Sequence, residues 1–380
     1  MIQPVLKNLY QIFLKYNFIY FSFFSVLISK NTNRAVVDFP NIPGYKTLAC
    51  DLHIHTVFSD GSVWPDIRIQ EALKDQLDVI AMTEHLEIQN WKADIPHPDR
   101  NRSFNLATEY AQNSGLVVLN GSEITREMPP GHANAIFLKD ANKLLLKNPL
   151  DVYKEAKNQG AFIFWNHPHW IAQSPDANIP LDPMHIKLIK NGLINGIEVV
   201  NDTTFSEEAL QLALDYDLTI IGTSDIHGII DWQYRTDQGG HRPVTLVFST
   251  EKTKKSIKKA LFSGRTAVWF KDNLIGKYER LLPLLKVSLG IEKAKYIKNS
   301  SVVNLKIKNK SSVPFIMRNV GDFNFYSDTN IFTVEANSFK IIDVKTKRKL
   351  RKFDLQFEVI NAITAPNTHP VIKISVSPKW

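Results

Sequence analysis

Between residues 48 and 270, short apolar runs alternate with amphipathic segments along the chain. The apolar runs are rich in Val, Ile and Phe and are bounded by polar or turn-forming residues, which is the pattern of buried β-strands. We expect strands at residues 48–53, 79–83, 117–120, 135–138, 162–165, 196–200, 219–222 and 244–248.

The segments between these runs have the spacing of amphipathic helices. Pro65 and Pro183 stand near the start of two of them, where a missing backbone N–H costs nothing. We expect helices at residues 65–75, 102–113, 152–158, 182–191, 206–216 and 253–262. Strands that alternate with helices form parallel sheets, so the pattern predicts an α/β domain that is either a barrel or a doubly wound sheet.

After about residue 282 the residue pattern changes, and Val, Ile, Phe and Thr alternate with polar residues. These runs lie at 302–307, 331–335, 340–344, 353–360 and 372–376. A period of two with Asn- and Ser-rich turns predicts a small antiparallel β-sandwich. It contains His369 but no cluster of metal-ligand residues, so we expect packing or presentation rather than chemistry. The predicted divisions are an N-terminal segment at 1–35, the α/β domain at 36–280 and the β-sandwich at 281–380.

The N-terminal segment has the order of a secretory signal peptide. Lys7 and Lys15 precede an apolar, aromatic-rich stretch at 18–28, and polar residues follow at 29–34. This stretch is short for a membrane span, which takes about 20 residues, and no small-residue cleavage site stands out. An uncleaved membrane anchor is therefore the alternative. We expect an exported protein that is periplasmic or secreted, or held at the membrane through this segment.

Composition excludes some broad classes of protein. With 44% hydrophobic and 22% charged residues, the chain of 380 residues resembles an ordinary globular protein, not a disordered or multi-span membrane protein. The net charge of +8 is concentrated in runs such as 252–259 and 345–352. Such runs are more often solvated faces than nucleic-acid sites, although positive charge would attract anionic substrates. We expect no nucleic-acid partner. Cys50 is the only cysteine, so no internal disulfide can form.

Histidines and acidic residues gather at the ends of the predicted strands. His53 and His55 close the first run one residue apart, so on an extended backbone both side chains point to one face and can reach one ion. Most of the other candidates follow later runs, and His132 precedes one. The candidate metal ligands are His53, His55, Asp60, His85, Glu123, His132, His167, Asp225 and His227.

These candidates can meet in one place if the domain is a barrel. The C-terminal strand ends of a parallel barrel converge on one mouth, which brings distant parts of the chain together. Imidazole with carboxylate suits zinc, iron or manganese, and the candidates exceed what one tetrahedral ion could use. We therefore expect two or three divalent ions (Mn, Zn or Fe). A single buried histidine is more often a core residue, so the repetition at strand ends carries this prediction.

The same residues stand in motifs that resemble those of the PHP (polymerase and histidinol phosphatase) family, in the family's order. They are Asp-Leu-His-Ile-His-Thr at 51–56, Ser-Asp-Gly at 59–61, Thr-Glu-His at 83–85, Gly-Ser-Glu at 121–123, Asn-His-Pro at 166–168 and Ser-Asp-Ile-His-Gly at 224–228. The resemblance covers about residues 48–270. It implies a distorted seven-stranded β/α barrel, TIM-like, with a trinuclear metal centre that hydrolyses phosphomonoesters or phosphodiesters.

The resemblance also implies which residues hold each ion. One ion would lie between His53, His55, Glu123 and Asp225. Glu123 would bridge to a second ion, whose other ligands are His132 and His167. The third would be held by Asp60, His85 and His227. Asp60 stands where some family members use histidine, which leaves the identity of the metal open.

The reaction expected from such a centre is attack by a metal-activated hydroxide on phosphorus. No Ser-His-Asp set or Gly-x-Ser-x-Gly elbow is visible, so a covalent intermediate is disfavoured. Arg242 and Arg126 are candidates for binding a phosphate oxygen, since guanidinium can do so bidentately. The residues expected to carry catalysis are His53, His55, Glu123, Asp225 and His227.

The substrate is expected to be a small phosphoester, with a diester favoured over a monoester. The alternatives are a phosphomonoesterase or nucleotide phosphatase, and a metal-binding module without catalysis. Amide or lactone cleavage is disfavoured because no lysine stands at a strand end to bridge metals. His241, His169 and Glu84 are candidates for supporting the ligands. The sequence predicts neither the oligomeric state nor the identity of the substrate.

Overall fold

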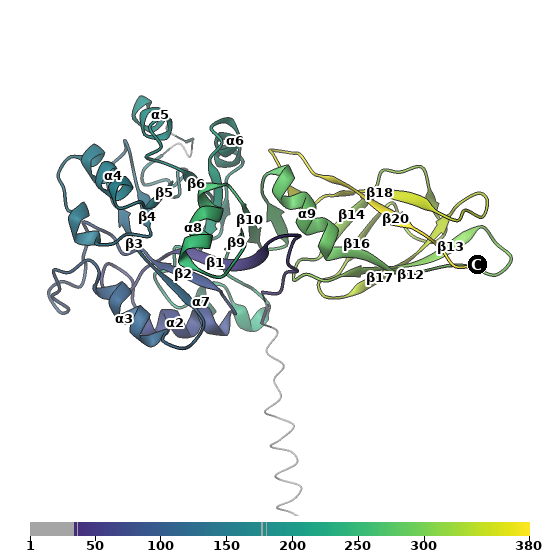
Figure 1. Cartoon of the computed structure of the whole chain (residues 1–380), viewed down its shortest axis with the longest axis horizontal. Coiled ribbons are helices and arrows are strands. Elements are labelled where there is room, and N and C mark those ends of the chain that lie inside the picture. The colour runs from purple at the N-terminus through teal and green to yellow at the C-terminus, as the bar shows by residue number, and fades with distance from the viewer. Residues whose placement is uncertain (1–33, 36, 176–177, 180) are drawn as a thin grey trace, which may run out of the picture.

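The computed structural model describes residues 34–35, 37–175, 178–179 and 181–380. An α/β domain is followed by an all-β domain (Figure 1). The predicted signal peptide or anchor lies outside the described residues, apart from Arg34 and Ala35. Within the described part of the chain, no helix is long and apolar enough to cross a membrane.

One curled sheet forms the centre of the α/β domain. Its hydrogen-bonded order is β19-β11-β10-β9-β1-β2-β3-β4-β5-β6-β7, and β8 pairs with β6. Each strand predicted for this domain has a counterpart, and β7, β10, β11 and β19 are additional. The strands are β1 (Lys46–Ile54), β2 (Val79–Met82), β3 (Val117–Ile124), β4 (Ala133–Ile136), β5 (Phe162–Trp165), β6 (Gly196–Asn201), β7 (Thr204–Phe205), β8 (Thr219–Thr223), β9 (Val244–Ser249), β10 (Thr266–Phe270), β11 (Asn273–Ile275) and β19 (Ala362–Ile363).

Helices surround this sheet (Figure 1), and α8 packs against residues of β1, β5 and β9. They begin where the sequence supplies a cap. The Asp182 side chain accepts from Met184 N at 2.8 Å, and Asn148 accepts from Leu150 N at 2.9 Å, each just before a proline at the first helical position. The helices are α2 (Pro65–Lys74), α3 (Arg102–Tyr110), α4 (Pro149–Asn158), α5 (Pro183–Lys190), α6 (Glu207–Asp215), α7 (Ile230–Gln233), α8 (Lys254–Phe262) and α9 (Tyr278–Ser288).

The sheet curls so that the end of β8 meets the end of β1. Asp225 N donates to His53 O at 2.9 Å, and His55 N donates to Ile226 O at 3.1 Å. This arrangement confirms the α/β class, but the predicted count of seven barrel strands is not confirmed. β4 and β9 run antiparallel to their neighbours, and β10, β11 and β19 extend the sheet. The connection at 125–132 is too short for a parallel crossover, which takes roughly a dozen residues, so β4 must run back along β3.

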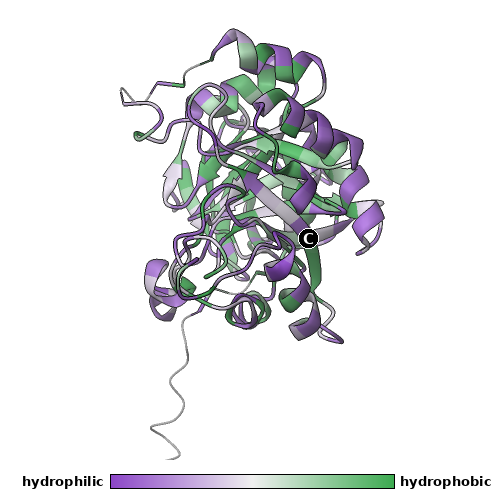
Figure 2. Ribbon diagram, turned by 90° about the vertical axis from the view of Figure 1, so that its left-hand side faces the viewer, coloured by the Kyte–Doolittle hydropathy of each residue, from purple (hydrophilic) through white to green (hydrophobic). Residues whose placement is uncertain are grey.

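Apolar side chains fill the inside of the curled sheet. Leu52, Phe162, Phe164 and Ile221 are among the fully buried residues of this inner core. Figure 2 shows hydrophobic residues concentrated on the central strands, with hydrophilic residues on the outer turns of the helices. The inner core lies beneath the strand ends and supports them from below.

The all-β domain contains two antiparallel four-stranded sheets, as predicted for a β-sandwich. Buried residues alternate with partly buried ones, as in β13, because each sheet has one face in the core and one toward solvent. One sheet contains β12 (Leu289–Tyr296), β13 (Val302–Asn309), β17 (Phe339–Lys345) and β15 (Asn324–Phe325). The other contains β16 (Ile331–Val334), β14 (Phe315–Asn319), β18 (Phe353–Val359) and β20 (Val371–Val376).

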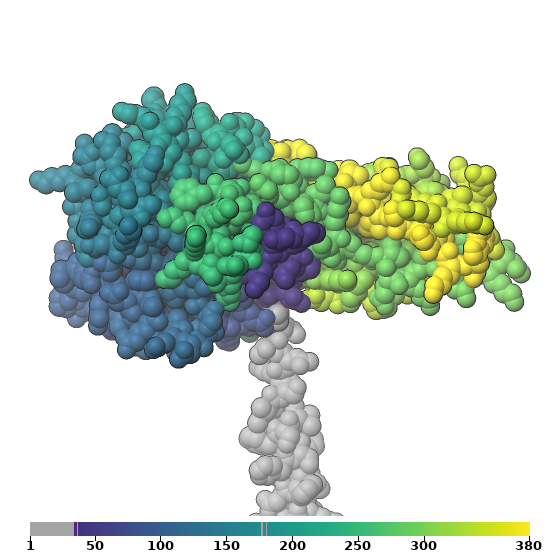
Figure 3. Space-filling view, viewed as in Figure 1, coloured from purple at the N-terminus to yellow at the C-terminus, as the bar shows by residue number. Residues whose placement is uncertain are grey.

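The two domains lie side by side (Figure 3), and backbone hydrogen bonds join them. Strand β19 belongs to the C-terminal part of the chain but pairs in parallel with β11 of the first domain. Leu274 N donates to Asn361 O at 3.0 Å, and Ser312 N donates to Asp38 O at 2.9 Å. The sandwich is therefore bound to the α/β domain at the sheet edge, and α9 leads from one to the other.

Candidate metal centre

A bulge at the end of β1 turns two histidines toward the inside of the sheet. Leu52 packs in the inner core, whereas Ile54 packs on the other face of the sheet, in a cluster with residues of α2 and α3. The pairing of β1 with β2 changes register between Asp51 and Ile54. Such a bulge re-aims the residues that follow it, so His53 points inward next to Leu52 and His55 shares its face.

Asp225 meets these two histidines from the end of β8. His53 Nε2 and His55 Nε2 lie 3.0 Å apart, and Asp225 Oδ1 lies 3.1 Å from each nitrogen. Asp225 has a left-handed backbone with φ of 50°, which Asp tolerates better than most residues. Both histidines are fully buried. The three side chains therefore aim ligand atoms at one point.

Glu123, at the end of β3, connects three further histidines. Its Oε1 lies 3.1 Å from His132 Nδ1 and 3.3 Å from His167 Nε2, and its Oε2 lies 2.6 Å from His85 Nδ1. His132 precedes β4, and because β4 runs antiparallel to β3, its first residue lies beside the end of β3. A histidine before a strand thus joins the acids and histidines that follow the other strands.

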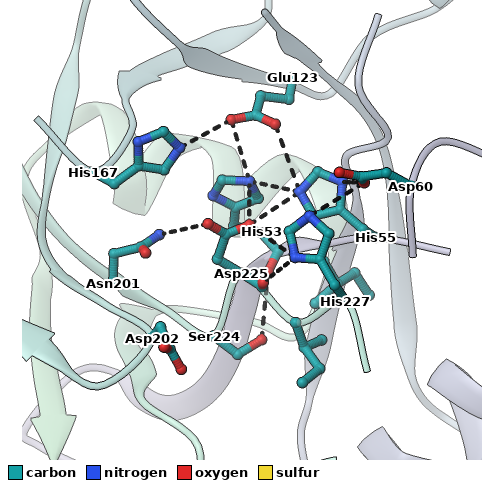
Figure 4. A network of polar contacts seen from close by, with 12 residues as sticks. His53, His55, Asp60, Glu123, His167, Asn201, Asp202, Ser224, Asp225 and His227 are labelled. Atoms are coloured by element: carbon teal, nitrogen blue, oxygen red, sulfur yellow. Dashed lines mark hydrogen bonds and ion pairs between the residues drawn. The ribbon is translucent and has the colours of Figure 1, made fainter. Parts of the chain in front are cut away.

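Asp60 holds the opposite side of the cluster. Its Oδ2 lies 3.2 Å from His85 Nε2, and its Oδ1 lies 3.2 Å from His227 Nε2. The His55 and His227 rings stack with centroids 4.2 Å apart. Figure 4 shows Asp60, His55 and His227 on one side of Asp225 and His167 on the other.

All the predicted ligands thus come together, and within the described residues they form overlapping groups able to hold a metal. The groups are His55, Asp60, His85 and His227; His53, His55 and Glu123; and His85, Glu123 and His132. Asp225 and His167 contact these groups directly. A cavity lies over these groups, and His53 and His55 are buried beneath it. The ligands that line this cavity are Asp60, His85, Glu123, His132, His167, Asp225 and His227.

The electrostatics of the cluster fit divalent cations. Burial lowers the pKa of His85, but the carboxylates of Glu123 and Asp60 outweigh burial and raise that pKa to about 10. Burial together with the positive charge of His227 lowers the pKa of His55 to about 4. Despite its burial, Glu123 keeps a pKa well below its usual value because of His85 and His53. The carboxylates thus stabilise positive charge in the cluster, and because histidine binds metal in its neutral form, a bound cation would take the place of the proton on His85.

Glu198 supports the cluster from below and was not predicted. This fully buried acid in β6 lies 2.8 Å from His53 Nδ1 through Oε1, and its Oε2 accepts from the backbone N of His167 at 2.8 Å. Thr223 also donates to it at 2.6 Å. In a metal-binding histidine, a carboxylate that accepts a hydrogen bond from the ring nitrogen not bound to metal fixes the tautomer and orientation of the ring. The signal in the sequence was an acid inside an otherwise apolar strand run.

The two arginines expected at the substrate lie elsewhere. Arg242 is buried and forms ion pairs with Asp51 Oδ2 at 3.1 Å and Asp75 Oδ2 at 2.7 Å. Arg126 pairs with Glu87 at 2.8 Å and donates to a backbone carbonyl. Neither arginine lines the cavity. The substrate-binding prediction for both is corrected, because their guanidinium groups are already occupied by acids of the fold.

The cavity above the cluster has a volume of about 760 Å³. Of the residues expected to support the ligands, His169 lines it, whereas His241 stacks on Trp269 at a centroid distance of 3.6 Å. Trp170 also lines the cavity. Glu84 lies below the His55 loop and accepts from Thr56 N at 3.0 Å. The remaining lining residues, which were not predicted, are Ile88, Ile171, Asn201, Asp202, Thr204 and Gln233.

Both domains are similar to known proteins. A family model described as an Ig-like domain matches residues 289–375. None of the curated proteins compared with the chain matches it. Among solved structures, the chain is similar to a two-domain protein from Bacteroides vulgatus ATCC 8482 that contains a predicted PHP-like metal-dependent phosphoesterase. The two share 40% identity and a TM-score of 0.84 over 90% of this chain and 99% of that chain.

Two more distant structures resemble parts of the chain. PsfC from Pseudomonas syringae PB-5123 has 18% identity and a TM-score of 0.43 over 60% of this chain and 92% of that one. A protein from Bifidobacterium adolescentis ATCC 15703, named as a candidate metal-dependent phosphoesterase, has 18% identity and a TM-score of 0.37 over 47% and 88%. Both are too distant to bear on the function of this chain.

Proposed function

The chain belongs to the PHP-like metal-dependent phosphoesterases, and from that premise we propose that it hydrolyses phosphodiesters at a trinuclear metal centre. The observation that carries the proposal is the meeting of all the predicted ligands at one cavity. They come from the ends of β1, β2, β3, β5 and β8 and from the start of β4. Histidine and carboxylate are seldom buried together in such number without a shared ion.

Three ions are supported by the way the ligand groups overlap. His55 and His85 each belong to two of the groups, and so does Glu123. Groups that overlap in this way would hold neighbouring ions, and Glu123, which belongs to two groups, would serve as a ligand in both. Oxygen and nitrogen ligands in this mixture suit manganese, zinc or iron.

The protein's own groups prepare the ligand atoms. The His53 Nδ1–H group donates a hydrogen bond to Glu198 Oε1 at 2.8 Å, so Nε2 faces the cluster. The His227 Nδ1–H group donates a hydrogen bond to the backbone O of Asp225 at 2.8 Å, so its Nε2 also faces the cluster. When bound, divalent ions would lower the pKa of a water molecule and offset charge on the phosphoryl oxygens. The cavity walls would then orient the substrate above the ligands.

The charge of the cavity supports a diester over a monoester. A phosphomonoester carries up to two negative charges near neutral pH, and a diester carries one. Bound ions would supply positive charge at the cluster, but no Lys or Arg is among the described residues that line the rest of the cavity, which presents Asp202. A substrate of lower negative charge is therefore the better match.

One experiment tests the proposal. The purified protein is assayed for bound metals and for hydrolysis of bis(p-nitrophenyl) phosphate and p-nitrophenyl phosphate, before and after chelation. We expect faster turnover of the diester, loss of activity on chelation and recovery with added metal. Faster turnover of the monoester would identify a phosphatase instead. Hydrolysis of neither compound by the metal-loaded protein would favour the non-catalytic metal-binding module.

We also propose that the protein is exported. The support comes from the basic and apolar order of the N-terminal sequence. Cell fractionation followed by mass spectrometry of the purified N-terminus tests this proposal. The protein is expected outside the cytoplasm, either shortened near residue 35 or attached to the membrane. Full-length protein confined to the cytoplasm would contradict it.

A further inference from the structure

The cavity has a wall beyond the metal ligands that the proposed reaction does not use. Asn201 and Asp202 follow β6, and Asp202 turns the chain with a left-handed φ of 50°. Figure 4 shows His167, Asn201 and Asp202 along one side of the cluster, opposite Asp60. This wall is where the alcohol part of a bound phosphoester would lie.

Asp202 is held so that one of its oxygens remains available. Its Oδ1 accepts from Gln233 Nε2 at 2.6 Å and from the Tyr234 hydroxyl at 3.0 Å. Burial, together with the charge of Asp202, raises the pKa of Tyr234 well above its usual value, so this hydroxyl stays protonated. The Oδ2 atom has a single weak contact, with Thr203 Oγ1 at 3.4 Å. Two donors thus fix the carboxylate while its second oxygen can still accept hydrogen bonds.

The surroundings of Asp202 favour a neutral group rich in hydrogen-bond donors. Gln233 and Thr204 line the same cavity and can exchange hydrogen bonds with hydroxyl groups. Lys271 and Arg235 line an adjoining cavity that shares Gln233 with this one, and the Lys271 ammonium contacts Thr203 O at 3.5 Å. A second phosphate or carboxylate beside Asp202 would be repelled.

An apolar part of the wall completes this side of the cavity. Trp170 is 45% exposed and Ile171 is 68% exposed, although both are large and apolar. The Trp170 ring lies 5.2 Å from His167 and 5.7 Å from His132, so it stands at the edge of the metal cluster. An exposed indole offers a flat face for the C–H side of a sugar or polyol, in the same cavity as a carboxylate that can accept from its hydroxyl groups.

We infer that Asp202 binds hydroxyl groups of the substrate's alcohol, so that the phosphodiester cleaved here is an ester of a polyol or sugar. The inference rests on the proposed phosphodiesterase function and adds the class of alcohol to it. Asp202 would act in substrate selection, away from the reacting phosphorus.

A matched pair of substrates tests the inference. Glyceryl p-nitrophenyl phosphate and n-propyl p-nitrophenyl phosphate share a leaving group and differ only in hydroxyl groups. We expect kcat/KM to be about tenfold higher for the glyceryl ester, which is typical of a hydrogen bond to a charged group. In Asp202→Gly this ratio should fall to about one, because glycine accepts the left-handed backbone but removes the carboxylate. Asp202→Asn should give an intermediate ratio.

The chain offers a matched control. Asp217 has a left-handed φ of 51° and a side chain that is 95% exposed, so Asp217→Gly makes the same change away from the cavity. This control should keep the wild-type ratio. A wild-type ratio near one, or an unchanged ratio in Asp202→Gly, would overturn the inference and leave the phosphodiesterase proposal standing. Failure of the metal-loaded wild-type protein to cleave either ester would count against the phosphodiesterase proposal itself.

Discussion

Glu198 should control metal affinity without being a ligand. Its carboxylate contacts His53 Nδ1 and the backbone N of His167, both at 2.8 Å. Glu198→Gln removes the negative charge that orients the His53 ring. We expect about a 10–100-fold loss of metal affinity, with activity recovered at high metal concentration. Titration of activity against free metal measures this change.

A control separates this effect from a general loss of charge. Glu207 is exposed at the start of α6, so Glu207→Gln should keep the wild-type metal dependence. If Glu198→Gln binds metal as tightly as the wild type, the positioning role of Glu198 is wrong. If excess metal does not restore its activity, Glu198 acts in some way other than through His53.

Arg242 should be needed for stability rather than for substrate binding. It is the cationic partner of Asp51 and Asp75, and both acids are buried. Arg242→Leu leaves Asp51 without a cationic partner and removes one of the two arginines that pair with Asp75, the other being Arg34, so we expect the free energy of unfolding to fall by about 3–5 kcal/mol. Chemical denaturation measures the loss. If the Arg242→Leu variant kept wild-type stability but had a raised KM for the substrate, Arg242 would instead be assigned to substrate binding.

Residues of the metal centre differ in how well their positions could be predicted. His53 and Asp225 follow apolar runs, and that placement alone indicates a strand end. Glu198 looks like part of a strand core, and only the folded structure shows that it lies beneath His53. Arg242 is polar and follows a glycine pair, as a binding residue would. Its partners Asp51 and Asp75 lie far away in the sequence, so its ion pairs could not be predicted.

Close packing of β8 against β10 gives a prediction at the level of elements. A Cβ added at Gly222 would lie 2.3 Å from Val268 Cγ1, too close for any side chain. Gly222→Ala should therefore destabilise the protein by about 1–3 kcal/mol, through overpacking. Gly290 in β12 has nothing within 4 Å of the same position, so Gly290→Ala is the control. Equal unfolding midpoints for the two variants would contradict this packing.

The positions of the strands along the chain could be predicted better than their direction in the sheet. Each buried run was recognisable as a strand because its apolar residues are continuous. The reversal of β4 depends on the short connection at 125–132, and the inward turn of His53 depends on a bulge in β1. Both are local backbone features that the hydrophobic periodicity of the sequence does not predict. They are also the features that bring His132 and His53 to the cluster.

At the scale of the whole molecule, the sequence indicated the β-sandwich but not its attachment. Apolar and polar residues alternate in 302–307 and 353–360. This pattern predicts strands, but it does not predict where the sandwich lies relative to the α/β domain. The pairing of β19 with β11 joins residues 362–363 to residues 274–275. Such a short strand has no periodicity of its own. The backbone pairing holds the Ig-like domain against the sheet that carries the metal ligands.

Metal should stabilise the α/β domain as a whole, because its ligands come from strands spread over that domain. His53, Glu123, His167 and Asp225 come from four different strand ends, and the unfolded chain cannot hold them together. Free metal at 100 times its dissociation constant should add about 2.7 kcal/mol to the free energy of unfolding. Calorimetry with metal or with chelator measures the resulting shift in Tm. In Glu123→Gln the shift should be much smaller, since this variant lacks the carboxylate shared by the ligand groups. An equal Tm with metal and with chelator would show that the ligands do not bind metal in the folded protein.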